Sequence, residues 1–181
     1  ASLYFEEKMF DSTLSICKNA ETYFPNNSIV LFYSGIALIQ KNEIEKAIPM
    51  LRNAIQNEKQ NKGLLAQIHS TLGDAFNTLK NYKSSDSSFD EALKIIPNDA
   101  SILNNYAYYL SVRNERLVDA EKMSKKSLEI QPNSKSFLDT YGWILYQQGN
   151  FEDAKIYIDK AIKSNGDEDG TLFEHLGDVF Y

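Results

Sequence analysis

The fold is decided by residues 135–166, which read KSFLDTYGWILYQQGNFEDAKIYIDKAIKSNG. Apolar residues recur every three or four positions on both sides of a Gly-Asn dipeptide at 149–150. This is the pattern of two amphipathic helices joined by a tight turn. Small residues stand at fixed offsets, at Gly142, Ala154 and Ala161. Because a small residue lets two helix backbones approach closely, the stretch predicts an antiparallel helix pair.

The same pattern repeats along the chain with a period near 35 residues. A small residue recurs in the first helix of each pair, at spacings of 38, 34, 35 and 35 residues: Gly35, Gly73, Ala107, Gly142 and Gly177. Small residues also mark the second helix, in two columns seven positions apart: Ala47, Ser85, Ala120 and Ala154, and Ala20, Ala54, Ala92, Ser127 and Ala161. Large apolar residues precede them: Phe10, Ile44, Tyr82, Leu117 and Phe151. Columns that stay in phase predict an all-α solenoid, in which each repeat packs on its neighbours.

The periodicity predicts one solenoid over residues 1–181, built of about five units and a truncated helix. The expected helices are 7–23, 28–40, 43–57, 64–79, 82–95, 100–112, 116–130, 135–148, 151–164 and 170–181, with 1–6 as the end of an earlier helix. They group into a partial repeat at 1–27, repeats at 28–61, 66–99, 100–134 and 135–169, and a truncated repeat at 170–181. Both termini therefore fall inside a unit, as in a fragment of a longer chain.

Irregularities interrupt the period at two places. The spacing of 38 places extra residues at 57–63, where Lys59 stands in the position of a closing proline. One residue is also inserted in the turn at 111–116. Where the closing proline is present, an Asn, Asp or Ser follows it and is expected to cap the next helix. Cys17, the single cysteine, forms no internal disulfide and is expected to be a buried thiol.

Composition restricts the classes of function. The 181 residues are 43% hydrophobic and 24% charged, which is typical of a globular protein. The net charge of −6 and the absence of a Lys/Arg run argue against nucleic acid as a partner. No apolar run reaches the roughly 18 residues of a membrane span. The acidic cluster at 167–169, between two glycines, is interpreted as a solvated loop, with a cation site as the alternative.

Nothing in the sequence indicates catalysis. His69 and His175 lie in different units, so they cannot join one metal-ligand set. No Gly-rich phosphate loop occurs, and Cys17 has no histidine near it in sequence. The chain is therefore expected to be non-enzymatic, with no cofactor and no metal.

The pattern resembles the tetratricopeptide repeat (TPR) family. The residues that carry the match are Leu72-Gly73 with Phe76, Tyr141-Gly142 with Leu145, and Ala154 with Ala161 and the earlier Pro132. The runs 104–110, 138–143 and 175–178 are similar to bacterial TPR proteins, some of them envelope-associated. The resemblance covers essentially the whole chain. It implies a right-handed superhelix of antiparallel helix pairs, whose first helices line a concave groove that binds peptides.

Projecting the first helices gives the candidate partner-binding residues of this groove: Phe32, Ile36, Asp74, Asn104, Tyr108, Asp139, Trp143, Tyr146, Glu174 and Asp178. The N-terminal members are mostly apolar, and the C-terminal members are aromatic and acidic. Such a surface suits an apolar or a basic partner segment. Ordinary packing between repeats is the alternative for both halves. Trp143 is the expected hot spot if it is exposed.

The groove-facing positions carry no Lys or Arg. This argues against the chaperone adaptors of the family, which clamp a partner's terminal carboxylate with basic residues. The expected function is a protein–protein interaction scaffold that binds a protein or peptide in the groove. The alternatives are a structural module that self-associates into homo-oligomers and the regulatory array of a larger enzyme. The compartment stays open between the cytoplasm and a bacterial periplasm or envelope.

Overall fold

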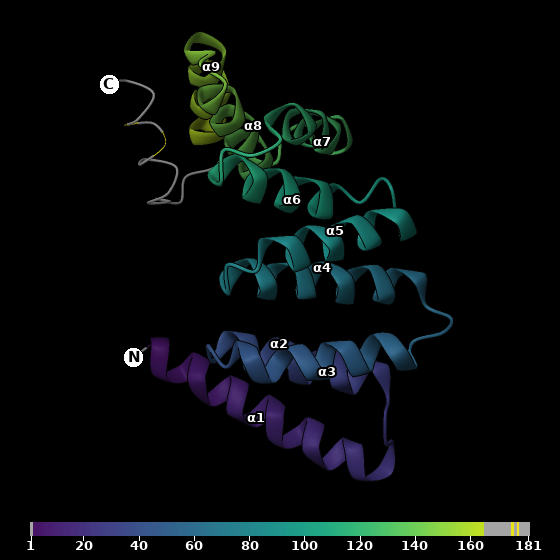
Figure 1. Ribbon diagram of the computed structural model, residues 1–181. Helices are drawn as coiled ribbons and strands as arrows, with labels where there is room; N and C mark the ends of the chain where they lie inside the picture. The colour runs from purple at the N-terminus through teal and green to yellow at the C-terminus, as the bar shows by residue number, and fades with distance from the viewer. Residues whose placement is uncertain (1, 165–174, 176, 178–181) are drawn as a thin grey trace. The chain divides into compact units, whose positions relative to one another are not determined.

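The computed structural model describes residues 2–164, 175 and 177, and over these residues it contains nine α-helices (Figure 1). Their bounds are α1 (Ser2–Tyr23), α2 (Ser28–Gln40), α3 (Ile44–Asn57), α4 (Lys62–Thr78), α5 (Tyr82–Ile95), α6 (Ala100–Val112), α7 (Leu117–Ile130), α8 (Lys135–Gln147) and α9 (Phe151–Lys163). The predicted helix at 170–181 lies outside the described residues, except for positions 175 and 177.

The first helix differs from the prediction. Residues 2–6 belong to the same helix as residues 7–23, and are not the end of an earlier one. The break was inferred from repeat register alone, and the sequence from Ser2 to Tyr23 contains no glycine or proline that would end a helix. Cys17 lies on this helix with 7% of its surface exposed, which confirms a buried thiol.

The chain divides into two compact units, Ala1–Pro97 and Asn98–Tyr181. In the first unit α2 packs on α3 and α4 packs on α5, while α1 contacts α2 and α3 contacts α4. In the second unit α6 packs on α7 and α8 on α9, and the first helices α6 and α8 also contact each other. Each unit is thus made of helix pairs, although the bounds of the individual repeats stay a prediction.

Close backbone contacts explain the column of small residues. A Cβ atom added to Gly35 would lie 2.7 Å from Leu51 Cδ2, and one added to Gly142 would lie 2.7 Å from Ile158 Cγ1. Such distances are far below a normal carbon–carbon contact, so each glycine is required by its pair of helices. Phe151 departs from its expected packing role, because its ring is 54% exposed and contacts Tyr146 at 5.5 Å between centroids.

The turns between helices follow the predicted chemistry in part. Asn27 caps α2 by accepting from the N–H groups of Ile29 and Val30, and Asp99 caps α6 in the same way. Ser134, the corresponding residue before α8, makes no such hydrogen bond. The turn with the inserted residue contains Asn114 and Arg116, which have φ angles of 53° and 48° in the left-handed region. The turn therefore accommodates the inserted residue with backbone strain at these two positions.

The extra residues at 57–63 are organised around one carboxylate. The Ser28 hydroxyl donates to Glu58 Oε2 at 2.7 Å, and the backbone N–H groups of Gln60 and Asn61 donate to Oε1 at 3.0 and 2.9 Å. These bonds, with that of Ser28 as the largest contribution, lower the pKa of Glu58 to about 2. Glu58 thereby ties the start of α2 to the loop between α3 and α4.

This site predicts a pH dependence of stability. The pKa of Glu58 is lower in the folded chain than its ordinary value of 4.5. Its contribution is therefore fully present above pH 4.5 and is lost as the pH falls towards about 2. Urea unfolding of the Glu58→Gln variant should show a shallower loss of stability over that acid range than wild type. The exposed Glu129→Gln is the control and should follow wild type. Superimposable acid curves for wild type and Glu58→Gln would contradict this role.

Candidate functional site

The predicted groove residues of the first unit lie mainly in its core. Phe32 is 8% exposed and belongs to the cluster that fills the space between α2, α3 and α4. Ile36 is half-buried and packs against the same cluster. Asp74, on α4, is half-buried. For Phe32 and Ile36 this placement favours the alternative of packing between helices.

In the second unit, α6 contributes two of the predicted residues. Asn104 is only 6% exposed, and its Oδ1 atom is buried with no hydrogen-bond partner among the described residues. Tyr108, one turn further along α6, is half-buried, and its ring centroid lies 5.9 Å from that of Tyr109. An unpaired buried amide oxygen costs about 1–3 kcal/mol, so Asn104 offers an acceptor for an incoming N–H group.

Two predicted residues of α8, Asp139 and Trp143, contact a histidine that was not among the predicted binding residues. We call Asp139, Trp143, Tyr146 and His175 the Trp143 cluster. The Trp143 ring stacks on the Tyr146 ring, with centroids 5.2 Å apart and planes 24° apart. It also stacks on the His175 ring, at 4.1 Å and 17°. Trp143 therefore has stacking contacts with two aromatic side chains before any partner arrives.

His175 is fixed by the carboxylate of Asp139. Its Nδ1 atom lies 2.9 Å from Oδ1 and 3.1 Å from Oδ2 of Asp139. The two side chains are 8% and 16% exposed. Because a carboxylate only accepts, we assign the proton to Nδ1 of the histidine. Asp139 is thus already paired within the chain.

The indole N–H of Trp143 is the unsatisfied group of the cluster. Its Nε1 atom is buried and has no acceptor among the described residues. The indole nitrogen is a donor only, so the partner it lacks is an acceptor such as a carbonyl oxygen. An unpaired donor (Trp143) and an unpaired acceptor (Asn104) thus occur on α8 and α6, which pack together.

The remaining predicted site residues, Glu174 and Asp178, lie outside the described residues, as does the acidic cluster at 167–169. His175 was not counted among the partner-binding residues, because helical spacing alone did not show its pairing with Asp139. It lies 36 residues after Asp139, one repeat length plus one position. That offset on the neighbouring helix is the signal that could have identified the pair.

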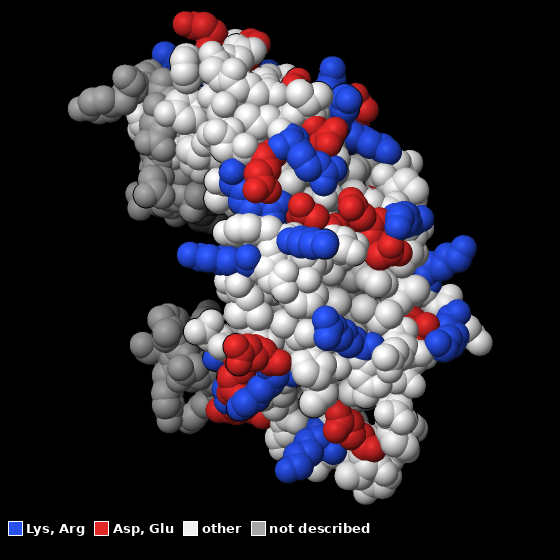
Figure 2. All heavy atoms as spheres, viewed as in Figure 1, with Lys and Arg blue, Asp and Glu red and all other residues white. Residues whose placement is uncertain are grey.

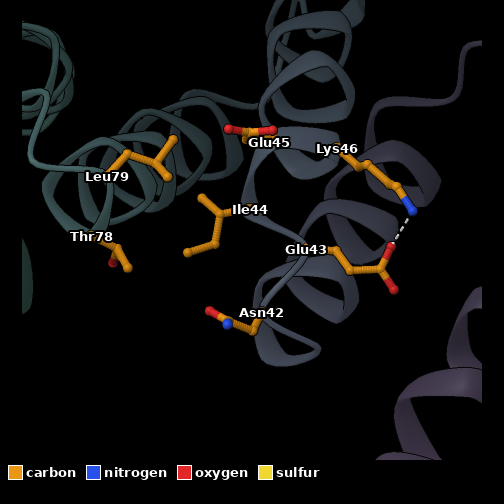
Figure 3. Close-up of a pocket in the computed structure, with 7 residues that line it drawn as sticks. All are labelled: Asn42, Glu43, Ile44, Glu45, Lys46, Thr78 and Leu79. Atoms are coloured by element: carbon orange, nitrogen blue, oxygen red, sulfur yellow. Dashed lines mark hydrogen bonds and ion pairs between the residues drawn. The ribbon is translucent and has the colours of Figure 1, made fainter.

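A further hollow of about 370 Å³ lies in the first unit (Figure 3). Ile44 and Leu79 extend into it from α3 and from the end of α4. The Lys46 ammonium donates to Glu43 at 2.6 Å, and this bond is the main cause of the lowered pKa of Glu43. Glu45 also lines the hollow, so its lining carries one net negative charge.

Comparison with known proteins identifies the repeats. The family model described as tetratricopeptide repeat matches residues 66–99 and 136–168, which include α4 with α5 and α8 with α9. The chain thus contains tetratricopeptide repeats over these two ranges. TPR proteins are protein-interaction modules, so protein partners are the general expectation for this chain.

Two relatives come from Pseudomonas aeruginosa. A TPR repeat-containing protein is 29% identical over 155 residues, which cover 85% of this chain and 25% of that protein. The type IV pilus assembly protein PilF is 23% identical over 148 residues, which cover 81% of this chain and 57% of PilF. The chain thus spans a quarter and rather more than half of the lengths of these relatives.

Solved structures agree on the fold. The PilF structure superimposes with a TM-score of 0.74 at 22% identity, covering 85% of this chain and 68% of PilF. YrrB, described as a TPR protein with an unusual peptide-binding site, gives 0.70 at 18% identity, covering 97% of this chain and 87% of YrrB. These similarities confirm the predicted all-α TPR superhelix of helix pairs.

Charges of both signs are mixed on the visible surface of the molecule. On the face shown in Figure 2, Lys and Arg side chains are interspersed with Asp and Glu, and neither sign forms a continuous stripe. Long-range steering by one sign of charge is therefore weak on that face.

Within the described part of the chain, no helix combines the length and apolar composition that crossing a bilayer requires.

Proposed function

We propose that this chain is a non-enzymatic scaffold that holds a segment of a partner protein against α6 and α8 of its second unit. The observation that carries the proposal is the Trp143 cluster, a stacked aromatic platform whose buried indole N–H has no acceptor in the described part of the chain. Rigid aromatic side chains supply contact area at a low cost in conformational entropy. Because these side chains already stack on one another within the chain, binding a partner would cost little further side-chain entropy.

The polar groups of this face suggest how the segment is held. The Trp143 indole N–H would donate to a backbone carbonyl, and Asn104 Oδ1 would accept from a backbone or side-chain N–H. Asp139 is paired with His175 and would have to release it before binding a basic side chain. The sequence suggested either an apolar or a basic partner segment. The proposed partner is therefore the uncharged, apolar segment.

The relatives support this function in outline. YrrB is described as having a peptide-binding site, and PilF as a pilus assembly protein. This likeness supports the proposal that the chain is a scaffold that brings other proteins together. The similarity to PilF favours the bacterial envelope over the cytoplasm as its setting.

Co-purification followed by mass spectrometry should identify the partner, and calorimetry with that partner then tests the site. Trp143→Ala should weaken binding about tenfold or more, because it removes the centre of the stack. Ile156→Ala, which truncates an apolar side chain 49% exposed on α9, is the control and should bind as wild type. Unchanged affinity of Trp143→Ala, with its helical circular dichroism intact, would rule out this face. Light scattering on the chain alone separates partner binding from self-association.

A further inference from the structure

A hollow of about 360 Å³ in the first unit lies between α3, α4 and α5. Its apolar floor includes Leu72 and Phe76 of α4, both buried. Its basic members are Arg52 of α3 and Lys83 of α5, together with His69 of α4. None of these three belongs to the predicted groove, and two of them lie on second helices. The hollow is therefore a feature separate from the Trp143 cluster.

The two cations at this hollow are available to a ligand. The Arg52 guanidinium carbon lies 5.6 Å from the centroid of the Phe76 ring, which holds the group over the apolar floor. Neither Arg52 nor Lys83 has an ion-pair partner among the described residues. Lys94, further along α5, is by contrast bound to Glu91 at 2.6 Å. Two cations without an ion-pair partner among the described residues thus line one concave site.

Serine side chains complete the donor set. Ser84 and Ser87 line the hollow from the first turns of α5, and over the described residues their hydroxyls have no hydrogen-bond partner. The Ser88 hydroxyl is committed, because it donates to the backbone oxygen of Ser84 at 2.8 Å. A planar guanidinium, an ammonium and two hydroxyls are the groups that replace the hydration of an oxyanion.

We propose that this hollow binds an oxyanion group, a carboxylate or a phosphate. The guanidinium and ammonium groups would contact the oxygens, and the Ser84 and Ser87 hydroxyls would donate to them. The site is a second ligand-binding site of the chain. It shares no residue with the Trp143 cluster.

Two further residues set the electrostatic balance of the site. Glu91 lines the same hollow and carries a negative charge that repels an anion, although its bond to Lys94 partly offsets that charge. Burial lowers the pKa of His69, so the imidazole is mainly neutral near pH 7. A bound anion favours the charged imidazolium and should raise the pKa of His69 again.

The test is a titration of the chain with inorganic phosphate and, separately, with acetate, followed through the NMR signals of the His69 ring. Binding should shift these signals and raise the pKa of His69. Arg52→Gln and Lys83→Gln should each weaken binding about threefold or more. Glu91→Gln should tighten it, because it removes the repelling charge and releases Lys94. Lys125→Gln, with the same change of charge in the second unit, is the control and should bind as wild type.

The two anions distinguish the source of the ligand group. A response to phosphate alone assigns a phosphoryl group, and a response to acetate as well assigns any oxyanion. The proposal is overturned if neither anion moves the His69 signals, or if Arg52→Gln and Lys83→Gln bind as tightly as Lys125→Gln. Trp143→Ala should leave the titration unchanged, so failure of this site and failure of the proposed partner site are separate results.

Discussion

Replacing Phe89 with alanine should lower the free energy of unfolding by about 3–5 kcal/mol, the usual range for emptying a buried aromatic site. Phe89 is fully buried, and its ring lies where α5 crosses Gly73 of α4. A Cβ atom on Gly73 would lie 2.8 Å from that ring. The pair therefore fills the closest approach of the two helices. Urea denaturation followed by circular dichroism measures the change.

Phe24→Ala is the matched control, because Phe24 is 62% exposed and its loss should change the free energy of unfolding by roughly 0.5 kcal/mol or less. A second comparison tests the contact itself. Gly73→Ala should destabilise the wild-type chain but be tolerated when Phe89 is alanine, since the clashing ring is gone. If Phe89→Ala and Phe24→Ala were equally mild, the described packing of α4 on α5 would be wrong.

Replacing Ala154 with leucine should cost about 1–3 kcal/mol of stability through overpacking. Ala154 is fully buried on α9, and its carbonyl oxygen would lie 3.1 Å from a Cβ atom on Gly142. Ile158 of α9 also lies against the position of that Cβ atom. The two helices α8 and α9 are therefore already in close contact near Ala154. Thermal unfolding measures the loss as a lower melting temperature.

The same substitution at Ala20 is the control for Ala154→Leu. Ala20, on α1, belongs to the other column of small residues in the second helices, the one that contains Ala161, and its side chain is only half-buried. The larger side chain can reach solvent there, so Ala20→Leu should cost clearly less. An unchanged melting temperature for Ala154→Leu would count against the register of α8 and α9.

The sequence predicted most of the fold because the repeat multiplies each local signal. A single Gly142 is ambiguous, but the same small residue at Gly35 and Gly73 shows that helices must approach closely there. The start of α1 could not be predicted from register, because no second copy of that segment exists in the chain. The exposure of Phe151 was also missed, since its column indicates an apolar residue without saying how deeply each copy is buried.

The candidate site was only partly predictable. Periodicity placed Asp139 and Trp143 on one face of a helix, but it could not show that His175 pairs with the first and stacks on the second. Such contacts depend on side-chain rotamers across neighbouring repeats, which spacing does not contain. The cations at Arg52 and Lys83 were missed because only first helices were projected, and these residues lie on second helices.

The most direct test of the proposed function uses the single tryptophan of the chain as its own reporter. Trp143 fluorescence is followed while a tryptophan-free partner peptide, labelled for anisotropy, is titrated into the protein. The emission of Trp143 should change in parallel with the anisotropy, because the partner would cover the indole and accept from its N–H group. Saturated anisotropy with an unchanged Trp143 emission would show that the partner binds elsewhere.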